Sequence, residues 1–315
     1  MNQSKFSLAD VLTILTALGF GFMCFLGTNF YTLGNVPKSI TVAVIITILL
    51  FSTVFTAKLL KRTSVNFKTR FIWEMVSLVV FTLLFVLFTY MPFSHYFTVS
   101  AKQSEILSKI KASITQAENM FPAYEAYAQN RKAFYESKIK SVVANKKGKP
   151  SDYDSCGFKN GIIPDETQLH KKMENINADL FPTNYSNLVT QKGIKEVATN
   201  WLLEAKDASR SWKPIGITNV VLTIEDKSNE WKNLLINLSQ IREKCEQADD
   251  FSFPLQFEDI KQNFTRREKP SSISLIIASL MWALMMLSWL VTKRHTRFPG
   301  FKLLFGRNGN TINEL

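Results

Sequence analysis

The sequence predicts a mainly α-helical integral membrane protein with four membrane-spanning helices. A large, mostly helical extracytoplasmic domain is inserted between the third and fourth of them. Three observations lead to this fold class: long apolar segments near both ends of the chain, one polar region of ordinary domain size between them, and basic residues clustered beside the apolar segments. The mean hydropathy of zero over 315 residues is the average of these two unlike parts.

Four segments are long and apolar enough to span a bilayer core of roughly 30 Å, which requires about 20 helical residues. Charged residues, proline or glycine bound each segment, so four buried helices of a soluble protein are the weaker alternative. The boundaries divide the chain into an N-terminal membrane region (1–95, with helices at 11–33, 40–57 and 71–90), a polar domain (96–270), a fourth helix (271–292) and a basic tail (293–315).

The positive charge of the chain is concentrated beside the apolar segments. The formal net charge is +12, yet the 26 Lys and Arg residues of the polar domain are nearly matched by its 23 Asp and Glu. A pI near 9.5 often accompanies nucleic-acid binding. Basic flanks of membrane helices explain this charge better, so we expect a lipid bilayer as partner and no nucleic acid.

Short loops rich in lysine and arginine remain in the cytoplasm, which orients the chain. Two basic clusters fall on one side of the membrane if both chain ends are cytoplasmic and residues 96–270 are extracytoplasmic; their members are Lys58, Lys61, Arg62, Lys68, Arg70, Lys293, Arg294 and Arg297. The basic stretch at 265–269 opposes this orientation. We expect a multi-pass protein of a bacterial inner (plasma) membrane.

The first part of the polar domain predicts a long amphipathic helix with coiled-coil-like spacing. Its less polar positions step by three and four residues: Ile110, Ile114, Ala117, Phe121, Tyr124, Ala128, Arg131, Tyr135 and Val142. Arg131 interrupts the stripe, and Pro122 predicts a kink or a helix restart. The stripe either packs within its own domain or mediates contact with another chain, and spacing alone does not separate these alternatives.

The rest of the polar domain is also mainly helical. Residues 145–164 are rich in turn-forming residues and predict a loop. Helices are expected from Asp165, where the sequence resembles a capping box, towards Leu180, and then over roughly 186–211 and 227–248. The β-branched stretch at 215–224 predicts a strand, or a connector if it has no partner strand.

Two of the three cysteines, Cys156 and Cys245, fall in the polar domain. In an oxidising compartment two such thiols commonly form a disulfide, and two unpaired buried thiols are the alternative. Cys24 lies within the first span and is expected to be a small packing residue.

The spans contain features that predict contacts between helices. Thr13, Ala17 and Gly21 are small residues four apart and would let another helix approach closely, unless their spacing is chance. Glu74 is the one ionisable residue inside a predicted span, and we expect it to face water or to pair with Arg70. Trp282 is expected to pack against another helix.

The motifs of common enzyme classes are missing from the sequence. No G-x-G-x-x-G follows a predicted strand, and P-loop, G-x-S-x-G, H-E-x-x-H and C-x-x-C patterns do not occur. Glu166, His170 and Glu174 share one helix face, as a metal site or an ordinary solvated face would. We therefore expect no catalytic residues, no cofactor and no resident metal, whereas a small-molecule ligand is neither predicted nor excluded.

These observations favour a non-enzymatic membrane anchor or scaffold. Its extracytoplasmic helical domain would mediate protein–protein interaction or self-association in an envelope complex. Two alternatives stay open: a channel or pore-forming subunit, and a membrane sensor that signals through a cytoplasmic partner.

Overall fold

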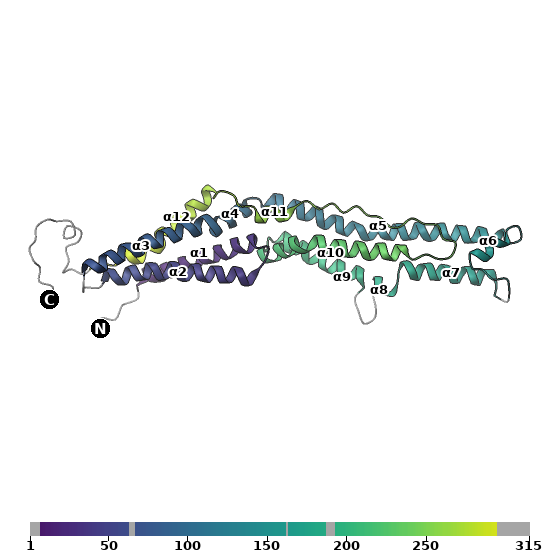
Figure 1. Cartoon of the computed structure of the whole chain (residues 1–315), viewed down its shortest axis with the longest axis horizontal. Coiled ribbons are helices and arrows are strands. Elements are labelled where there is room, and N and C mark those ends of the chain that lie inside the picture. Colours follow the sequence, from purple (N-terminus) through teal and green to yellow (C-terminus); the bar gives the residue numbers. More distant parts are fainter. Residues whose placement is uncertain (1–6, 63–66, 162, 187–192, 295–315) are drawn as a thin grey trace, which may run out of the picture. The chain divides into compact units, whose positions relative to one another are not determined.

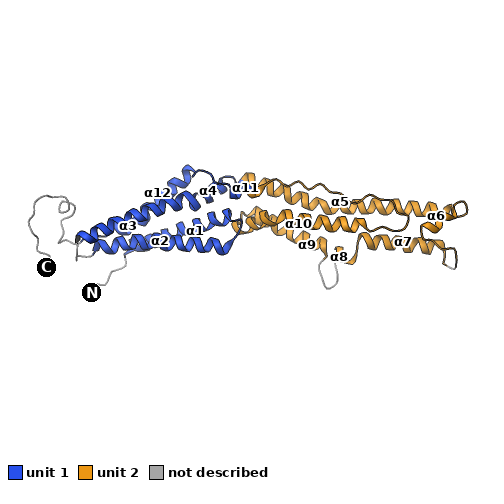
Figure 2. Cartoon of the chain, viewed as in Figure 1, with its two compact units in different colours: residues 1–103, 262–315 blue, residues 104–261 orange. Residues whose placement is uncertain are grey.

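A computed structural model of the chain describes residues 7–62, 67–161, 163–186 and 193–294. Within these ranges the regular structure is helical and contains no strand, which confirms the predicted mainly α fold class (Figure 1). The chain forms two compact units (Figure 2). Unit 1 comprises residues 1–103 and 262–315, and unit 2 comprises residues 104–261.

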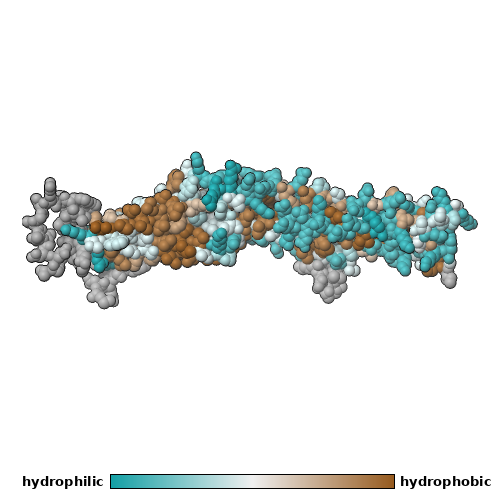
Figure 3. Space-filling model, in the orientation of Figure 1, coloured by the Kyte–Doolittle hydropathy of each residue, from teal (hydrophilic) through white to brown (hydrophobic). Residues whose placement is uncertain are grey.

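Unit 1 contains four helices that are long and apolar enough to cross a membrane, as the sequence predicts. Its elements are α1 (Leu8–Tyr31), α2 (Val36–Arg62), α3 (Phe67–Phe88), η1 (Thr89–Phe93), α4 (Ser94–Ala101) and α12 (Ser272–Val291). Hydrophobic residues gather on the visible face of this unit, and hydrophilic residues dominate that of unit 2 (Figure 3). The apolar outer surface suits a hydrocarbon environment. A soluble protein would carry polar groups on the same surface.

The third candidate span is longer than the sequence analysis predicts. The helical path runs over Lys68–Ala101 rather than ending near Tyr90, because η1 and α4 continue it through Pro92. In η1 the backbone of Met91 leaves the helical conformation (φ −165°, ψ 123°), which redirects the chain before α4 begins. Proline removes a helical hydrogen bond and clashes with the preceding turn, so a break at this position is expected.

The core of unit 1 is built from aromatic and aliphatic side chains of all four spans. Phe20 of α1 stacks on Phe93, with 4.7 Å between the ring centroids, and lies at the same distance from Phe85 of α3. Leu50 of α2 and Met285 of α12 complete this buried cluster. Such packing leaves the helices fixed against one another by dispersion contacts, the main source of association where lipid is the solvent.

Unit 2 is a helical domain around one long helix. Its elements are α5 (Gln103–Ala144), α6 (Pro150–Ser155), α7 (Asp165–Leu180), α8 (Thr183–Ser186), α9 (Ile194–Arg210) and α10 (Pro214–Gln240), followed by a segment without regular structure that leads to α11 (Ile260–Thr265). The predicted loop at 145–164 carries the short helix α6, and α7 begins at Asp165 as expected.

The apolar stripe of α5 packs inside unit 2. Ile110, Tyr124 and Tyr135 have no exposed surface, and Arg131 is only 4% exposed. The intramolecular alternative is therefore the one that the fold uses. The helix also runs through Pro122 without restarting, so the predicted restart near Phe121 is wrong.

The predicted strand or connector at 215–224 is also wrong, because these residues form the beginning of α10. Ile217, Val220, Val221 and Ile224 are buried, and their spacing of three and four is that of a helix face. Pro214 occupies the first turn of the helix, where its missing N–H costs nothing. One helix ending at Gln240 thus replaces both the strand and the helix predicted over 227–248.

Candidate functional site

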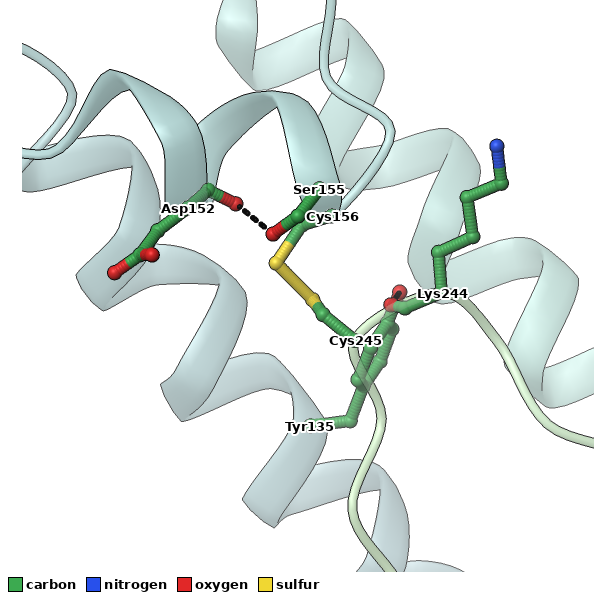
Figure 4. Close-up of a disulfide and its surroundings, with 6 residues drawn as sticks. All are labelled: Tyr135, Asp152, Ser155, Cys156, Lys244 and Cys245. Carbon is green, nitrogen blue, oxygen red and sulfur yellow. Dashed lines mark hydrogen bonds between the residues drawn. A yellow bond between two sulfur atoms is a disulfide. The ribbon is translucent and has the colours of Figure 1, made fainter.

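A disulfide between Cys156 and Cys245 closes one region of unit 2, as predicted for two thiols in an oxidising compartment (Figure 4). Cys156 follows α6, and Cys245 lies in the segment after α10. The side chain of Tyr135, from α5, lies beside the bridge, and its hydroxyl donates to the carbonyl of Lys244 at 3.4 Å. The disulfide therefore joins two irregular segments against the central helix.

The bridge spans 89 residues and so includes α7, α8, α9 and α10 in its loop. A loop of this length restricts the unfolded chain strongly, and chain-entropy models give a stabilisation of about 4 to 5 kcal/mol. The bonded sulfurs also pack with Tyr153, Phe158 and Ile176 in a buried cluster. Most of unit 2 is thus held closed by one covalent bond and its apolar surroundings.

Arg131 interrupts the apolar stripe of α5, and its side chain organises the end of α10. Its guanidinium donates to the carbonyl of Ser239 at 2.7 Å and to the carbonyl of Ile241. It also forms a two-point contact with the Glu246 carboxylate, with one distance of 2.9 Å. Carbonyls at a helix C-terminus lack intrahelical partners, so Arg131 caps α10 from a neighbouring helix.

The Arg131–Glu246 pair is almost completely buried, with side-chain exposures of 2% and 1%. Burial alone would lower the pKa of Arg131, but the hydrogen bonds and charge of Glu246 outweigh it and raise that pKa. Nearby, burial and the charge of Glu243 raise the pKa of Asp179. A buried pair with all its hydrogen bonds made fixes the geometry of its neighbours, and removing one partner is costly.

Residues 241–259 return along α5 after the cap. The Tyr127 hydroxyl donates to the Asp249 carbonyl at 2.7 Å, and Gln116 accepts a hydrogen bond from the backbone N–H of Gln256 at 3.0 Å. Further along, Lys109 lies 3.6 Å from the Glu258 carboxylate. Side chains of α5 thus hold this irregular segment at three levels of the helix.

A second buried ion pair lies inside unit 1. Lys58 of α2 donates to Asp10 of α1, and Ser288 of α12 donates to the same carboxylate oxygen. Lys58 is 6% exposed, so its ammonium group points into unit 1, whereas a lysine at the end of a span commonly extends its charge to the membrane surface. The sequence contained a signal for this pair, since antiparallel helices bring the start of α1 beside the end of α2.

A third cluster surrounds Glu74, which has no exposed surface. Its carboxylate accepts two hydrogen bonds from Arg294, each of 2.8 Å, and one from the Trp289 indole at 2.9 Å. Lys61 donates to the carbonyl of Trp289 and lies 4.2 Å from the centre of its ring. Glu74 is therefore buried and paired with Arg294, far away in sequence, and both predicted alternatives, contact with water or a pair with Arg70, are wrong.

The remaining basic residues of the predicted cytoplasmic clusters are less enclosed. Arg62, Lys68 and Lys293 are exposed and Arg70 is half-buried, whereas Arg297 lies outside the described residues. Thus Lys58, Lys61 and Arg294 bind other parts of unit 1, and Arg62, Lys68 and Lys293 present their charges at its surface.

The small residues of α1 face other spans. Thr13 is buried and donates to the carbonyl of Met285 in α12 at 3.1 Å. A Cβ atom at Gly21 would stand 2.0 Å from the hydroxyl oxygen of Thr47 in α2, and Ala17 is 2% exposed. Thr13 thus contacts α12, whereas Gly21 lies against α2.

Several large apolar side chains of unit 2 remain exposed. On α10, Ile215 and Leu222 are 49% and 43% exposed, and their spacing of seven places them on one side of the helix. Phe134 of α5 is 58% exposed and follows the capping Arg131 by three residues. The other members are Ile163, Val197, Leu203 and Ile241. Single exposed apolar groups are ordinary, so the two that lie on one side of α10 are the candidate contact surface.

The possible metal ligands of α7 lie at the surface. His170 and Glu174 are exposed and 3.4 Å apart, a spacing typical of a solvated helix face.

Comparisons of this chain with protein-family models, with curated proteins and with solved structures found no match.

Proposed function

We propose that the protein is a non-enzymatic membrane anchor or scaffold. Unit 1 holds the chain in the bilayer, and unit 2 presents a rigid helical frame to a protein partner or to a second copy. The observation that carries the proposal is that unit 2, an insertion between the third and fourth spans, is closed by a disulfide and a buried cap while apolar side chains remain on its surface.

The proposed orientation places unit 2 outside the cytoplasm and residues 57–70 and 293–315 inside. Two independent chemical arguments support it. Basic loops remain cytoplasmic, and disulfides persist in oxidising compartments such as the periplasm. Digestion of intact spheroplasts tests it: external protease should remove unit 2, and protection of unit 2 until the membrane is broken would contradict it.

The proposed contact surface centres on α10. The exposed residues Ile215 and Leu222 lie about 10 Å apart along the helix axis at 1.5 Å per residue. On the opposite, buried side α10 packs against α9 through Trp231 and Trp201, with 5.7 Å between the ring centroids. A partner would meet a supported surface, which lowers the entropy cost of binding.

The first experiment is purification of the tagged chain from membranes in mild detergent, with the mass of the intact complex measured and its components identified. A reproducible, stoichiometric companion protein or a defined homo-oligomer is the expected result. Leu222→Lys should lower the companion or oligomer yield at least tenfold. The control Asn237→Lys makes the same change of charge about 22 Å further along the exposed side of α10 and should leave the yield unchanged.

A monomer without companions would overturn the scaffold proposal. A homo-oligomer that conducts ions in liposomes would replace it with the channel alternative. The centre of unit 1 is filled by Phe20, Phe81 and Phe85, and its buried charges are paired with one another. This favours the scaffold, because a conducting path requires water or unpaired polar groups along the spans.

A further inference from the structure

A cavity of about 310 Å³ lies in unit 1 between α3, η1 and α12. Its lining is mainly apolar and includes Phe85 of α3, and Leu275 and Ala278 of α12. The volume is at the lower end of the range for small-molecule sites, which is about 300–1,000 Å³. The two buried ion pairs of unit 1 contribute no residue to it, so it is a separate feature of the spans.

Two residues that line this cavity carry hydrogen-bond donors that are not used. Thr89 is 7% exposed, and its hydroxyl oxygen is buried. The indole nitrogen of Trp282 is also buried. Neither atom has a hydrogen-bond partner among the residues that the structure describes. A polar group without a partner costs several kcal/mol in a hydrocarbon environment. Both donor atoms have almost no accessible surface, so an acceptor oxygen in the cavity reaches them only after the side chain turns towards it.

The cavity opens on the apolar outer surface of the spans. Val86 and Tyr90 of α3 and η1 are 59% and 61% exposed, and Leu275 opposite them is 48% exposed. In a bilayer these side chains face lipid, so an occupant can enter sideways. A partner helix is about 10–12 Å thick and is too large for this volume, whereas one flexible hydrocarbon chain fits.

We propose that the cavity between α3, η1 and α12 is a lipid site. A glycerophospholipid places one acyl chain against Phe85, Leu275 and Ala278. Rotation of the Thr89 or Trp282 side chain then lets an oxygen of the same lipid accept a hydrogen bond from it. The lipid thereby fills the space between the third and fourth spans, the two spans that carry unit 2. This proposal does not depend on the scaffold function.

Native mass spectrometry of the full chain in detergent tests the site. The chain is first stripped of lipid and then titrated with dioleoyl phosphatidylglycerol as the probe. One lipid should bind at least tenfold more tightly than any further lipid. Ser279→Phe places a large ring in the cavity lining and should weaken this first binding at least tenfold.

Ser52→Phe is the matched control. Ser52 and Ser279 are both exposed serines that donate to a carbonyl of their own helix, at 3.1 Å and 2.8 Å, but Ser52 lies on α2 outside the cavity. The Ser52→Phe variant should bind the lipid as tightly as the unaltered chain does. Thr89→Val removes only the donor group, and Trp282→Phe removes the donor together with part of the ring; at least one should weaken the first binding threefold or more.

Three results would overturn the proposal. The first is that no lipid binds more tightly than the rest. The second is that Ser279→Phe and Ser52→Phe behave alike. The third is that neither donor variant changes the affinity. Circular dichroism and the free-thiol count of each variant show whether it folds. Valine is close to threonine in volume, so Thr89→Val keeps the test valid if the Ser279→Phe variant does not fold.

Discussion

At the scale of single residues, the buried charged groups of this chain have partners that lie far away in sequence. Arg131 interrupts an apolar stripe, yet it caps α10 and binds Glu246, which is 115 residues further along. Glu74 binds Arg294 in the same manner. Each buried charge is satisfied by hydrogen bonds from a different element, which is the condition under which a buried ion is tolerated.

Arg131→Met should destabilise unit 2 by about 3 to 5 kcal/mol, because it leaves Glu246 buried without a counter-charge and uncaps the end of α10. Urea unfolding of the full chain, followed by the fluorescence of the tryptophans in unit 2, measures the change. The control is Lys140→Met, which removes an exposed pair with Glu136 and should cost about 0.5 kcal/mol or less. Equal losses for both variants would contradict the capping role.

Asp165 provides a prediction about pH. Hydrogen bonds from the Tyr153 hydroxyl and from Lys146, the latter at 3.1 Å, lower the pKa of Asp165. A carboxyl group whose folded pKa is depressed stabilises the protein above its unfolded pKa near 3.9, and the contribution disappears as the pH falls through the folded value.

Asp165→Asn should therefore lower the unfolding temperature at pH 7, and the difference from the unaltered chain should shrink as the pH falls below about 4. Thermal unfolding by circular dichroism across this range measures it. Asp154→Asn, at an exposed position on α6, controls for the loss of one negative charge. A difference that grows on acidification would have the wrong sign and reject this account.

At the scale of elements, the backbones of α1 and η1 approach each other closely at Gly27. A Cβ atom at Gly27 would stand 2.1 Å from the backbone carbonyl oxygen of Pro92 in η1. That oxygen cannot rotate away, in contrast to a flexible side chain. Gly27 thus lets α1 pass the break in the third span, where the backbone leaves the helical conformation.

Gly27→Ala should destabilise unit 1 by about 1 to 3 kcal/mol, because the added methyl forces the two backbones apart. Thermal unfolding of the detergent-solubilised chain measures the loss. Gly19→Ala is the matched control on the same helix, since its nearest atom would be the Met281 methyl carbon at 3.5 Å, an ordinary contact. The close approach is rejected if both alanines are tolerated equally.

At the scale of the whole molecule, the disulfide connects the fold to the compartment in which it forms. Of the three cysteines, Cys24 is buried in α1 with a free thiol, and Cys156 and Cys245 are bonded. Oxidation of the pair requires unit 2 to meet an oxidising environment. A domain that stayed in the cytoplasm would not meet one.

The denatured, unreduced membrane protein should therefore react with one equivalent of a maleimide reagent, and the reduced protein with three. Cys245→Ser should leave two reactive thiols and lower the free energy of unfolding of unit 2 by about 4 kcal/mol. Gel-shift alkylation and urea unfolding measure these results. Three reactive thiols without reductant would place unit 2 in a reducing compartment and contradict the proposed orientation.

The sequence predicted the features that depend on residues close together in the chain. Apolar segments of about 20 residues identified the four spans, since the thickness of a bilayer sets that length. The 3- and 4-residue spacing identified α5 and its buried face. The same local reasoning failed at 215–224, where β-branched residues suggested a strand and the helical spacing of their buried members decided otherwise.

The proposed contact surface and the lipid site could not be predicted from the sequence. Trp282 was expected to pack against another helix, but the cavity beside it depends on how α3 and α12 separate around η1. Ile215 and Leu222 appear in the sequence as ordinary apolar residues, and only the packing of α9 and α10 shows that they stay exposed.

The sequence by itself determined the mainly helical fold, the four helices able to span a membrane and the pair of cysteines able to bond, because length, composition and residue chemistry act without knowledge of the fold. Tertiary structure decided which charges meet, which stripe is consumed inside unit 2 and where an unfilled cavity remains. Those outcomes depend on side chains tens to hundreds of residues apart, and only their arrangement in space brings Arg131 to Glu246, Asp10 to Lys58 and Thr89 to the cavity it shares with Trp282.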